Sequence, residues 1–396
     1  MAPLTFHDAR EVVLQAVRAA RTPVVEEAGL LDAMGRVLAE TVAADRDSPA
    51  VSRSARDGFA VRAADLPGEL DVVGEVRAGE SFAGEVGAGQ AVAIMTGAPV
   101  PLGADAVAMV ENTVQSGARV RISEAAQPGK NINPRACDAA AGEPLLLAGK
   151  RLDFTDIALL AAVGRTRVPV YRKPVVAIVP TGDEVVDVAA VPRDYQVRNS
   201  NAYALAAQVI RAGGRAKILP IARDNPEHTW DMIERGLTCD LLLLSGGVSA
   251  GKYDVVEPVL HSLGATIHFD GVLIQPGQPL VFGCVAGKFF FGLPGNPSST
   301  MVTFEVFGRA ALELLAGQEE VPLCMPFARL TCEFRHRAGL TRFLPARLSC
   351  NGAEVTPVVW HGSADIPALT RSNAFLVADP ERPEYAAGDP IRVLIK

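Results

Sequence analysis

The central part of the chain alternates between short apolar runs and longer segments in which apolar residues recur every three or four positions. The run Leu241–Leu244 predicts a strand that is buried on both faces. The segment that starts at Asn201 predicts a helix, and one face of it carries Tyr203, Ala206, Ala207 and Ile210. Strands that alternate with helices favour a mainly parallel sheet, so we predict an α/β domain over residues 173–318.

The flanking segments follow other patterns. Residues 5–20 predict a helix capped by Thr5, and residues 30–39 predict a second helix. Short β-like runs broken by glycine and proline then indicate β structure on both sides of the α/β domain. We therefore predict a multidomain α/β and β fold, with a discontinuous N-terminal domain (1–46 plus 140–172), a β-rich inserted domain (47–139), a central α/β domain with a mainly parallel sheet (173–318) and a small C-terminal all-β domain (319–396).

Three of the predicted parallel strands end in turns of small residues. The turns are Thr181-Gly182-Asp183-Glu184, Ser245-Gly246-Gly247-Val248-Ser249 and Pro294-Gly295-Asn296-Pro297-Ser298-Ser299. Backbone N–H groups at such turns can cradle an anion, and ligands of open α/β sheets bind at the carboxyl ends of the strands. A single loop of this kind is better explained as a tight turn. Three on one sheet edge predict a site for a phosphorylated ligand.

Carboxylates follow the same strands. Asp183, Glu184, Asp224 and Asp254 are expected to converge near the edge where the three turns lie. Next to phosphate-binding amides they would repel an anionic ligand unless a divalent cation bridges them. The alternative role for each is that of a helix N-cap or a first-turn acid, and Asp224 before Asn225-Pro226 suits that role well.

Composition and charge exclude several classes of protein. The chain has 38 basic and 45 acidic residues, a net charge of −7 and no block of basic residues, which argues against general nucleic-acid binding. The apolar runs are too short to span a bilayer, and the first residues lack a signal-peptide core, so we expect a cytoplasmic protein with reduced cysteines. The sequence also lacks a dinucleotide-binding G-x-G-x-x-G and a P-loop.

Six short motifs together identify a family. They are S-A-R-D-G-F-A (54–60), M-T-G-A-P (95–99), T-G-D-E (181–184), S-G-G-V-S (245–249) with Asp254, Q-P-G-Q-P (275–279) and G-L-P-G-N-P (292–297). In this order and spacing, the chain resembles the molybdopterin molybdenumtransferase family over essentially its whole length. These are the molybdenum insertases that include bacterial MoeA and the gephyrin E domain. The resemblance implies four subdomains and an elongated homodimer, with its active cleft between the α/β domain of one subunit and the β insertion of the other.

The resemblance also implies a reaction, its cofactor and its residues. Molybdate is inserted at the dithiolene of adenylylated molybdopterin and AMP is released, with Mg²⁺ or a similar divalent cation. The implied catalytic acids are Asp57, Asp138, Glu184 and Asp254, and the implied metal ligands are Asp224 and Asp254. The implied substrate-binding residues are Thr96, Thr181, Gly182, Asp183, Ser245, Gly246, Gly247, Ser249, Pro276, Gly277, Gln278, Pro294, Gly295, Asn296, Pro297, Ser299 and Ser363. The implied partners are the molybdopterin adenylyltransferase and recipient molybdoenzymes.

The chain departs from the family's pattern at several positions. Arg56 stands where methionine is usual, and the segment 131–138 keeps only one arginine of an arginine-rich turn. Gln275 and Gln278 replace two lysines, which removes positive charge from a site expected to bind molybdate, although a glutamine amide can still donate hydrogen bonds. Pro345 replaces an arginine, for which the candidate substitutes are Arg342 and Arg347.

Three hypotheses about function therefore stand side by side. The retained acids favour an insertase. The two glutamines favour a pterin-binding or scaffolding paralogue that keeps the pocket but turns over poorly. The third hypothesis is a nucleotidyltransferase that adenylylates molybdopterin, and the additional β domains argue against it.

Overall fold

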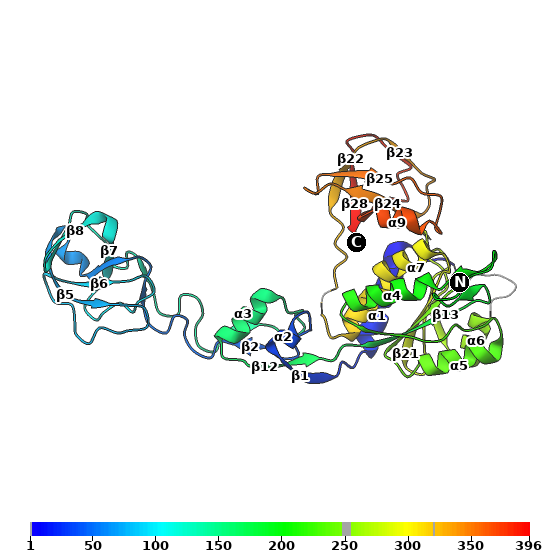
Figure 1. The fold of residues 1–396 in the computed structure, drawn as a ribbon, viewed down its shortest axis with the longest axis horizontal. Coiled ribbons are helices and arrows are strands. Elements are labelled where there is room, and N and C mark those ends of the chain that lie inside the picture. Colours follow the sequence, from blue (N-terminus) through cyan, green and yellow to red (C-terminus); the bar gives the residue numbers. More distant parts are fainter. Residues whose placement is uncertain (1, 248–254, 320) are drawn as a thin grey trace. The chain divides into compact units, whose positions relative to one another are not determined.

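The computed structural model describes residues 2–247, 255–319 and 321–396, and the chain divides into two compact units. Unit 1 comprises Met1–Ala39, Gly149–Asp153 and Val168–Lys396, and unit 2 comprises Glu40–Ala148 and Phe154–Arg167. Both are drawn in Figure 1. The finer division into four domains stays a prediction.

A six-stranded sheet forms the centre of unit 1. Its strand order is β16 (Arg215–Ile218), β13 (Val175–Pro180), β17 (Leu241–Ser245), β21 (Lys288–Leu293), β20 (Val281–Val285) and β18 (Thr266–Phe269). The first four strands are parallel, and β20 runs antiparallel to both of its neighbours. The predicted α/β domain with a mainly parallel sheet is therefore confirmed.

Helices cover both faces of this sheet. They are α1 (Phe6–Ala20), α4 (Ser200–Arg211), α5 (Pro226–Gly236), α6 (Val256–Ser262), α7 (Pro297–Thr303) and α8 (Arg309–Leu315), and a π-helical turn, η3 (Phe304–Gly308), joins the last two. Leu241 and Leu243 pack into one apolar cluster with residues of α1, α4 and η3. Leu242 and Leu244 pack into a second cluster with residues of α5 and α6. Strand β17 is thus buried on both faces, as its four leucines predict.

Two helix predictions need correction. The second helix, α2 (Leu30–Ala33), ends well before residue 39, because Gly35 adopts a left-handed conformation with φ of +73°. Helix α4 begins after its N-cap Asn199 and buries Ala202, Leu205 and Val209. The side chains of Tyr203 and Ile210 are exposed instead, so the residues that pack on the sheet lie on a neighbouring face of the helix.

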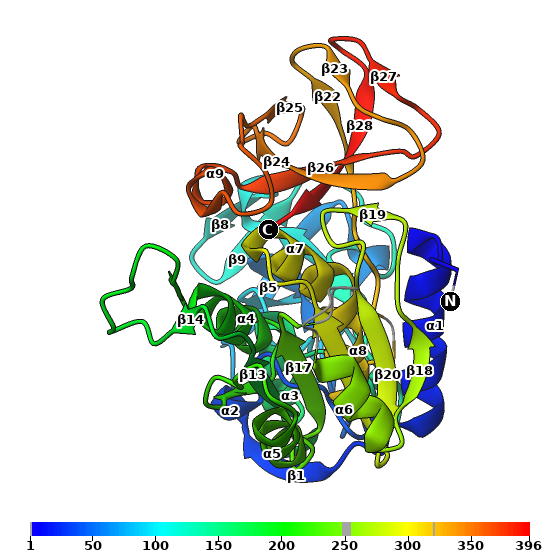
Figure 2. The same cartoon turned by 90° about the vertical axis from the view of Figure 1, so that its right-hand side faces the viewer.

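A small closed barrel forms the carboxyl-terminal part of unit 1. Its strands are β22 (Phe327–Leu330), β24 (Thr341–Leu348), β25 (Glu354–Pro357), β26 (Ala374–Ala378) and β28 (Pro390–Ile395), and the pairing of β24 with β26 closes it. The ribbon β23 (Phe334–Arg335) with β27 (Glu384–Tyr385) and the short helix α9 (Ile366–Arg371) complete it. Strand β19 (Ile274–Gln275), which precedes β20, pairs with β24. Figures 1 and 2 show the barrel beside α7.

Unit 2 is rich in β structure. Its six-stranded sheet has the order β7 (Ala106–Met109), β4 (Gly58–Val61), β6 (Gln90–Ile94), β5 (Gly68–Val76), β9 (Arg119–Ile122) and β8 (Thr113–Ser116). Helix α3 (Phe154–Ala162) and the 3₁₀ turns η1 (Ala63–Asp65) and η2 (Val110–Asn112) also belong to this unit. The predicted combination of α/β and β-rich parts is confirmed.

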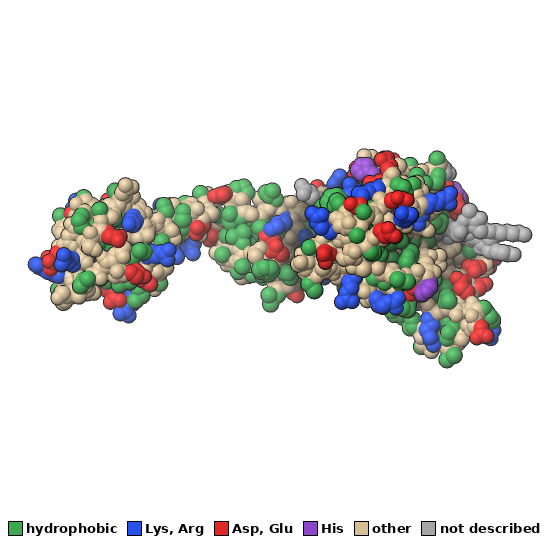
Figure 3. Space-filling view, turned by 90° about the horizontal axis from the view of Figure 1, so that it is seen from above, with side chains coloured by type: hydrophobic (Ala, Val, Ile, Leu, Met, Phe, Trp, Pro, Cys, Tyr) green, Lys and Arg blue, Asp and Glu red, His purple; other side chains and the backbone are tan. Residues whose placement is uncertain are grey.

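Short two-stranded pairings complete the fold. They are β1 (Val25–Gly29) with β12 (Arg167–Tyr171), β2 (Val42–Ala43) with β11 (Pro144–Leu146), β3 (Arg53–Ser54) with β10 (Ile132–Asn133), and β14 (Val185–Val186) with β15 (Val197–Arg198). The segment that carries β14 projects outward beside α4 (Figure 2). Among the described residues, no helix combines the length and apolar character that a membrane span requires. Basic and acidic side chains are interspersed over the face shown in Figure 3.

Candidate functional site

The three predicted turns lie together at the carboxyl ends of β13, β17 and β21. The Thr181 N–H donates to the Ser245 carbonyl at 3.1 Å, and the Gly246 N–H donates to the Leu293 carbonyl at 3.0 Å. Gly182 and Gly246 have φ angles of +124° and +102°, which favour glycine. A Cβ atom on Gly246 would lie 2.8 Å from Thr181 Oγ1, so the first two turns touch without room for a side chain.

A pocket of about 710 Å³ opens beside these turns. Its wall contains seven of the residues assigned to the site from the sequence, namely Thr181, Glu184, Ser245, Gly246, Gly295, Asn296 and Pro297. The β14–β15 ribbon contributes Val185 and Val197, and the segment leading into α9 contributes Ala364. The pocket therefore combines turn residues, of which Gly295 and Asn296 are exposed, with apolar side chains and the cation Arg198, which is typical of a small-molecule site.

The sequence analysis missed the contribution of helix α4 to this pocket. Asn199 and Asn201 both line it. The Asn199 side chain caps α4 by accepting from the Ala202 N–H at 3.3 Å. The Asn201 amide nitrogen donates to the Gly295 carbonyl at 2.7 Å. The available signal is the run Arg198-Asn199-Ser200-Asn201 at a helix start, which by itself indicates a helix boundary and no more.

Two of the predicted carboxylates are brought together at the edge of the sheet. Asp224 Oδ2 accepts from the Asp183 N–H at 3.1 Å, and Asp183 Oδ1 accepts from the Asp224 N–H at 3.3 Å. The two acids thus cap each other's backbone and remain exposed. The Glu184 carboxylate folds over Gly182, since a Cβ atom on that glycine would lie 2.4 Å from Glu184 Oε2.

The donor chemistry of this acidic pair fits a hard divalent cation. Each reciprocal hydrogen bond uses one carboxylate oxygen, and carboxylate oxygens are the ligands that Mg²⁺ prefers. In the part of the chain that the structure describes, no cluster of three or more acidic, histidine or cysteine residues is arranged to hold a metal ion. Asp254, the other implied metal ligand, and Ser249 lie outside the described residues.

The loop that carries Pro276, Gly277 and Gln278 lies against α7. Gly277 has a φ of +111°, and a Cβ atom there would lie 2.4 Å from Thr303 Cγ2 and 3.8 Å from the Ser299 carbonyl oxygen. Pro276 is buried and Gln278 is exposed. The loop therefore approaches α7 as closely as a glycine allows.

The surroundings of this loop distinguish the two candidate arginines. Gln275 is paired in register with Arg342 across β19 and β24. Burial, and then the neighbouring Arg337, lower the pKa of Arg342. Arg347 pairs with Thr356 further along β24. Of the two arginines, Arg342 is thus the one whose backbone adjoins the glutamine loop.

The remaining predicted residues of unit 1 surround the start of α7. Pro294 accepts a hydrogen bond from Thr300 Oγ1 through its carbonyl, and Ser299 is buried. The Ser363 carbonyl accepts from the Ser298 N–H at 2.8 Å. Ser363 therefore lies beside the first turn of α7, and Gly247 continues the turn after β17.

Three predicted residues belong to unit 2. Asp57 Oδ1 accepts from the Thr96 N–H at 2.7 Å, and this backbone hydrogen bond lowers the pKa of Asp57. Thr96 and Asp138 both line a second pocket, of about 560 Å³, within this unit. Cys137 Sγ lies 3.6 Å from Asp138 Oδ1, and burial followed by the Asp138 charge raises the pKa of the thiol.

Family models match almost the whole chain. Residues 4–164 match the "MoeA N-terminal region (domain I and II)", residues 177–314 the "Probable molybdopterin binding domain", and residues 328–396 the "MoeA C-terminal region (domain IV)". The central match contains the three turns and the acidic pair of unit 1.

Individual relatives agree with these models. A molybdopterin molybdenumtransferase of Bacillus subtilis is 35% identical over 384 residues, which cover 93% of this chain and 89% of the relative. A molybdopterin molybdenumtransferase of Nostoc is 40% identical over 72% of this chain and 68% of its own length. The crystal structure of a molybdopterin biosynthesis MoeA protein from Pyrococcus horikoshii OT3 matches with a TM-score of 0.85 and 27% identity over the full length of both chains. The expected resemblance is thereby confirmed, and the chain belongs to the molybdopterin molybdenumtransferase (MoeA) family.

Proposed function

We propose that this chain acts in molybdenum cofactor biosynthesis by inserting molybdate into adenylylated molybdopterin, with release of AMP. The observation that carries the proposal is the pocket of about 710 Å³ beside the turns after β13, β17 and β21, with Glu184 in its wall. Exposed turn backbone suits the phosphates of such a substrate, and the apolar part of the wall suits a heterocycle.

The residues of the site divide into two roles. The turns at Ser245–Gly247 and Gly295–Pro297 would hold the pterin phosphate, because their small residues let the ligand approach the backbone. The Thr181 and Gly182 N–H groups already donate to the Ser245 and Ala222 carbonyls, so the Thr181–Gly182 turn would shape the adjoining wall. Asp224 and Asp254 would hold a divalent cation such as Mg²⁺ beside Asp183. When bound, that cation offsets the negative charge of the pyrophosphate group. Glu184 would orient water toward the pyrophosphate, since its carboxylate folds over Gly182 at the pocket wall.

The glutamine loop is the main argument for the alternative, a pterin-binding or scaffolding paralogue. Two lysines that would attract molybdate are replaced by Gln275 and Gln278. Arg342 favours the insertase nevertheless, because its backbone pairs in register with that of Gln275 and so keeps a cationic residue on the neighbouring strand.

The family resemblance further supports a cytoplasmic homodimer that exchanges substrate and product with the adenylyltransferase and with recipient molybdoenzymes. In that assembly Asp57 and Asp138 would act on substrate bound by the α/β domain of the other subunit. Thr96 would contribute through its backbone bond to Asp57.

Single turnover with adenylylated molybdopterin, Mg²⁺ and molybdate tests the proposal. We expect AMP and molybdenum-loaded cofactor to form together, and we expect Asp254→Ala to abolish both. Asp231→Ala, which removes an exposed carboxylate on α5, is the matched control and should react like the wild type. Tight binding without AMP release would support the scaffold instead, and pyrophosphate release from ATP and molybdopterin would support an adenylyltransferase.

A further inference from the structure

The side chain of Asn201 joins three segments that surround the pocket of unit 1. Its amide nitrogen donates to the Gly295 carbonyl at 2.7 Å and lies 3.3 Å from both Ser245 Oγ and Thr300 Oγ1. A primary amide has two N–H donors, so the two hydroxyl oxygens share one of them. One side chain of α4 is thereby bonded to the end of β17, to the turn after β21 and to α7.

These bonds lie where the sheet itself no longer fixes the separation of the turns. Within residues 245–247 and 293–297, the backbone link between the two turns is the bond from Gly246 N–H to the Leu293 carbonyl. Beyond it, a Cβ atom on Gly295 would lie 3.7 Å from Gly246 Cα, so the two turns run past each other in van der Waals contact. Asn201 holds both turns on the side that lines the pocket.

The carbonyl oxygen of the Asn201 amide gives a second observation about this residue. Its Oδ1 atom is buried and has no hydrogen-bond partner in the described part of the chain. Buried acceptors without a partner are rare. In the described residues, the Asn201 side chain therefore bonds through its nitrogen alone, and its acceptors belong to the turns beside the pocket and to α7.

We propose that Asn201 is a positioning residue that sets the spacing of the Ser245–Gly247 and Pro294–Pro297 turns for ligand binding. The inference rests on the proposed function for the identity of the ligand. Without the amide donor, the Gly295 carbonyl and the Ser245 hydroxyl lose their common partner, and the turn backbone no longer presents its N–H groups at a fixed separation. Affinity for the pterin phosphate therefore decreases while the sheet stays intact, because the strands below the turns keep their own hydrogen bonds.

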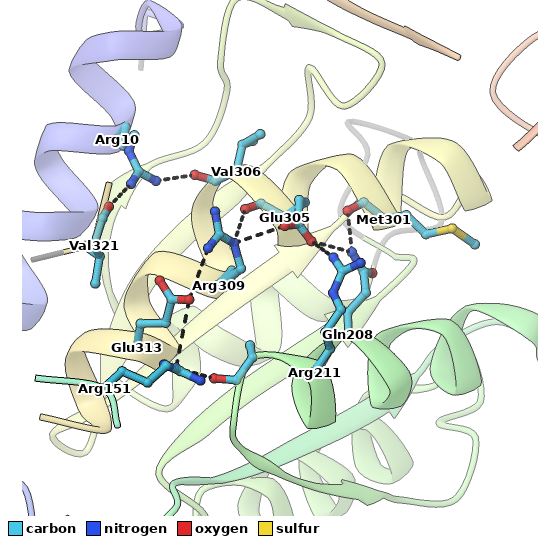
Figure 4. A network of polar contacts seen from close by, with 11 residues as sticks. Arg10, Arg151, Gln208, Arg211, Met301, Glu305, Val306, Arg309, Glu313 and Val321 are labelled. Atoms are coloured by element: carbon cyan, nitrogen blue, oxygen red, sulfur yellow. Dashed lines mark hydrogen bonds and ion pairs between the residues drawn. The ribbon is translucent and has the colours of Figure 1, made fainter. Parts of the chain in front are cut away.

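Asn201→Ala tests this role, with Gln208→Ala as a closely matched control. Gln208 lies on the same helix about two turns further on. It also donates to the α7 segment, to the Met301 carbonyl at 3.0 Å, and its Oε1 atom is also buried without a partner among the described residues. Figure 4 shows the Gln208 side chain directed toward Met301 and Glu305. Of these two side chains, it is Asn201 that is hydrogen-bonded to the turns beside the pocket.

The measurements are molybdopterin affinity, the single-turnover rate at saturating substrate, and the melting temperature. We expect Asn201→Ala to weaken affinity about tenfold, as the loss of one or two hydrogen bonds predicts, while the saturated rate changes less than twofold. Gln208→Ala should lower the melting temperature by a similar amount and leave affinity unchanged. Thr300→Val removes a hydroxyl that accepts from Asn201 and also bonds to the Pro294 and Asn296 carbonyls, so it loosens the same turn, should weaken affinity too, and serves if Asn201→Ala does not fold.

The outcomes separate this inference from the function on which it rests. If wild-type protein neither binds molybdopterin nor releases AMP, the proposed function fails first. If the wild type binds and both Asn201→Ala and Thr300→Val bind equally well, Asn201 is structural only and the inference is overturned. Equal losses of affinity in Asn201→Ala and Gln208→Ala would overturn it as well.

Discussion

Single glycines decide how closely the turns of the site approach one another. Gly246 and Gly277 both adopt positive φ angles, and both face a neighbouring segment at a distance that excludes a methyl group. At Gly246 the neighbour is Thr181 of the adjacent turn, and at Gly277 it is Thr303 of α7. These positions need glycine for two separate reasons, the backbone conformation and the space.

A comparison of Gly246→Ala with Gly264→Ala separates the cost of the backbone conformation from the cost of the missing space. Gly264 also has a positive φ, of +77°, but nothing lies within 4 Å of its hypothetical Cβ atom. We expect Gly264→Ala to cost about 1 kcal/mol of stability through backbone strain alone. Gly246→Ala should cost about 2–3 kcal/mol, because the methyl group also displaces Thr181, and it should weaken molybdopterin binding. Denaturant titration and a binding assay measure both effects, and equal costs at the two sites would contradict this account.

Ion pairs connect residues within the segment from α7 to α8 and join this segment to α4. Figure 4 shows Arg309 between Glu305 and Glu313, with Arg211 of α4 reaching Glu305. Arg10 of α1 donates to the Val306 carbonyl at 2.7 Å within the π-helical turn, and burial is the main cause that lowers its pKa. A π turn leaves the regular helical hydrogen-bond pattern. The arginine of α1 therefore donates to a buried carbonyl of this irregular turn.

Glu305→Ala should destabilise this element more than a surface charge change does. The Glu305 side chain is only 9% exposed and pairs with two arginines, so its removal takes the partner of Arg211 and leaves Arg309 with Glu313. We expect a loss of about 2–3 kcal/mol, below the cost of breaking a fully buried pair because Arg211 is half exposed. Asp231→Ala on α5 breaks an exposed pair with Arg235 and should cost less than about 1 kcal/mol. Urea denaturation compares the two, and equal midpoints would show that the Glu305 network contributes little.

The elements that sequence patterns predict well are those that a single dominant periodicity defines. Leu241–Leu244 predict a strand buried on two faces, and residues of the turn that follows line the pocket as expected. Helix α4 was harder to interpret, because alanine occurs on several of its faces and the sheet selects Ala202, Leu205 and Val209. The role of Asn201 could not be predicted, since its acceptors lie 44, 94 and 99 residues away in the chain. Contacts of that kind become visible only in the folded structure.

At the scale of the whole molecule, the two units differ in how their cores are built. Two apolar clusters lie within unit 2, one around Phe59 and Leu70 and the other around Val76 and Val92. In unit 1 the barrel shares a core with the α/β domain, because Phe343 and Phe375 belong to the cluster that contains α1 and β17. Phe6 of α1 stacks edge-on against both Phe307 and Phe343. The barrel thus has one apolar cluster of its own, around Leu330 and Leu376, and contributes other residues to the α/β core.

Two truncations test this difference. A fragment of residues 40–167 should fold alone and unfold cooperatively, because both apolar clusters of unit 2 lie within it. A chain that ends at residue 326 should aggregate or melt well below the full-length protein, because removal of the barrel uncovers Phe6 and the apolar residues around it. Each large apolar side chain that becomes exposed costs about 2 kcal/mol, so the loss of several contacts approaches the whole stability of a domain. Circular dichroism melts and size-exclusion chromatography of both fragments provide the measurement. A chain ending at 326 that stays monomeric with an unchanged melting temperature would show that the barrel and the α/β domain are independent after all.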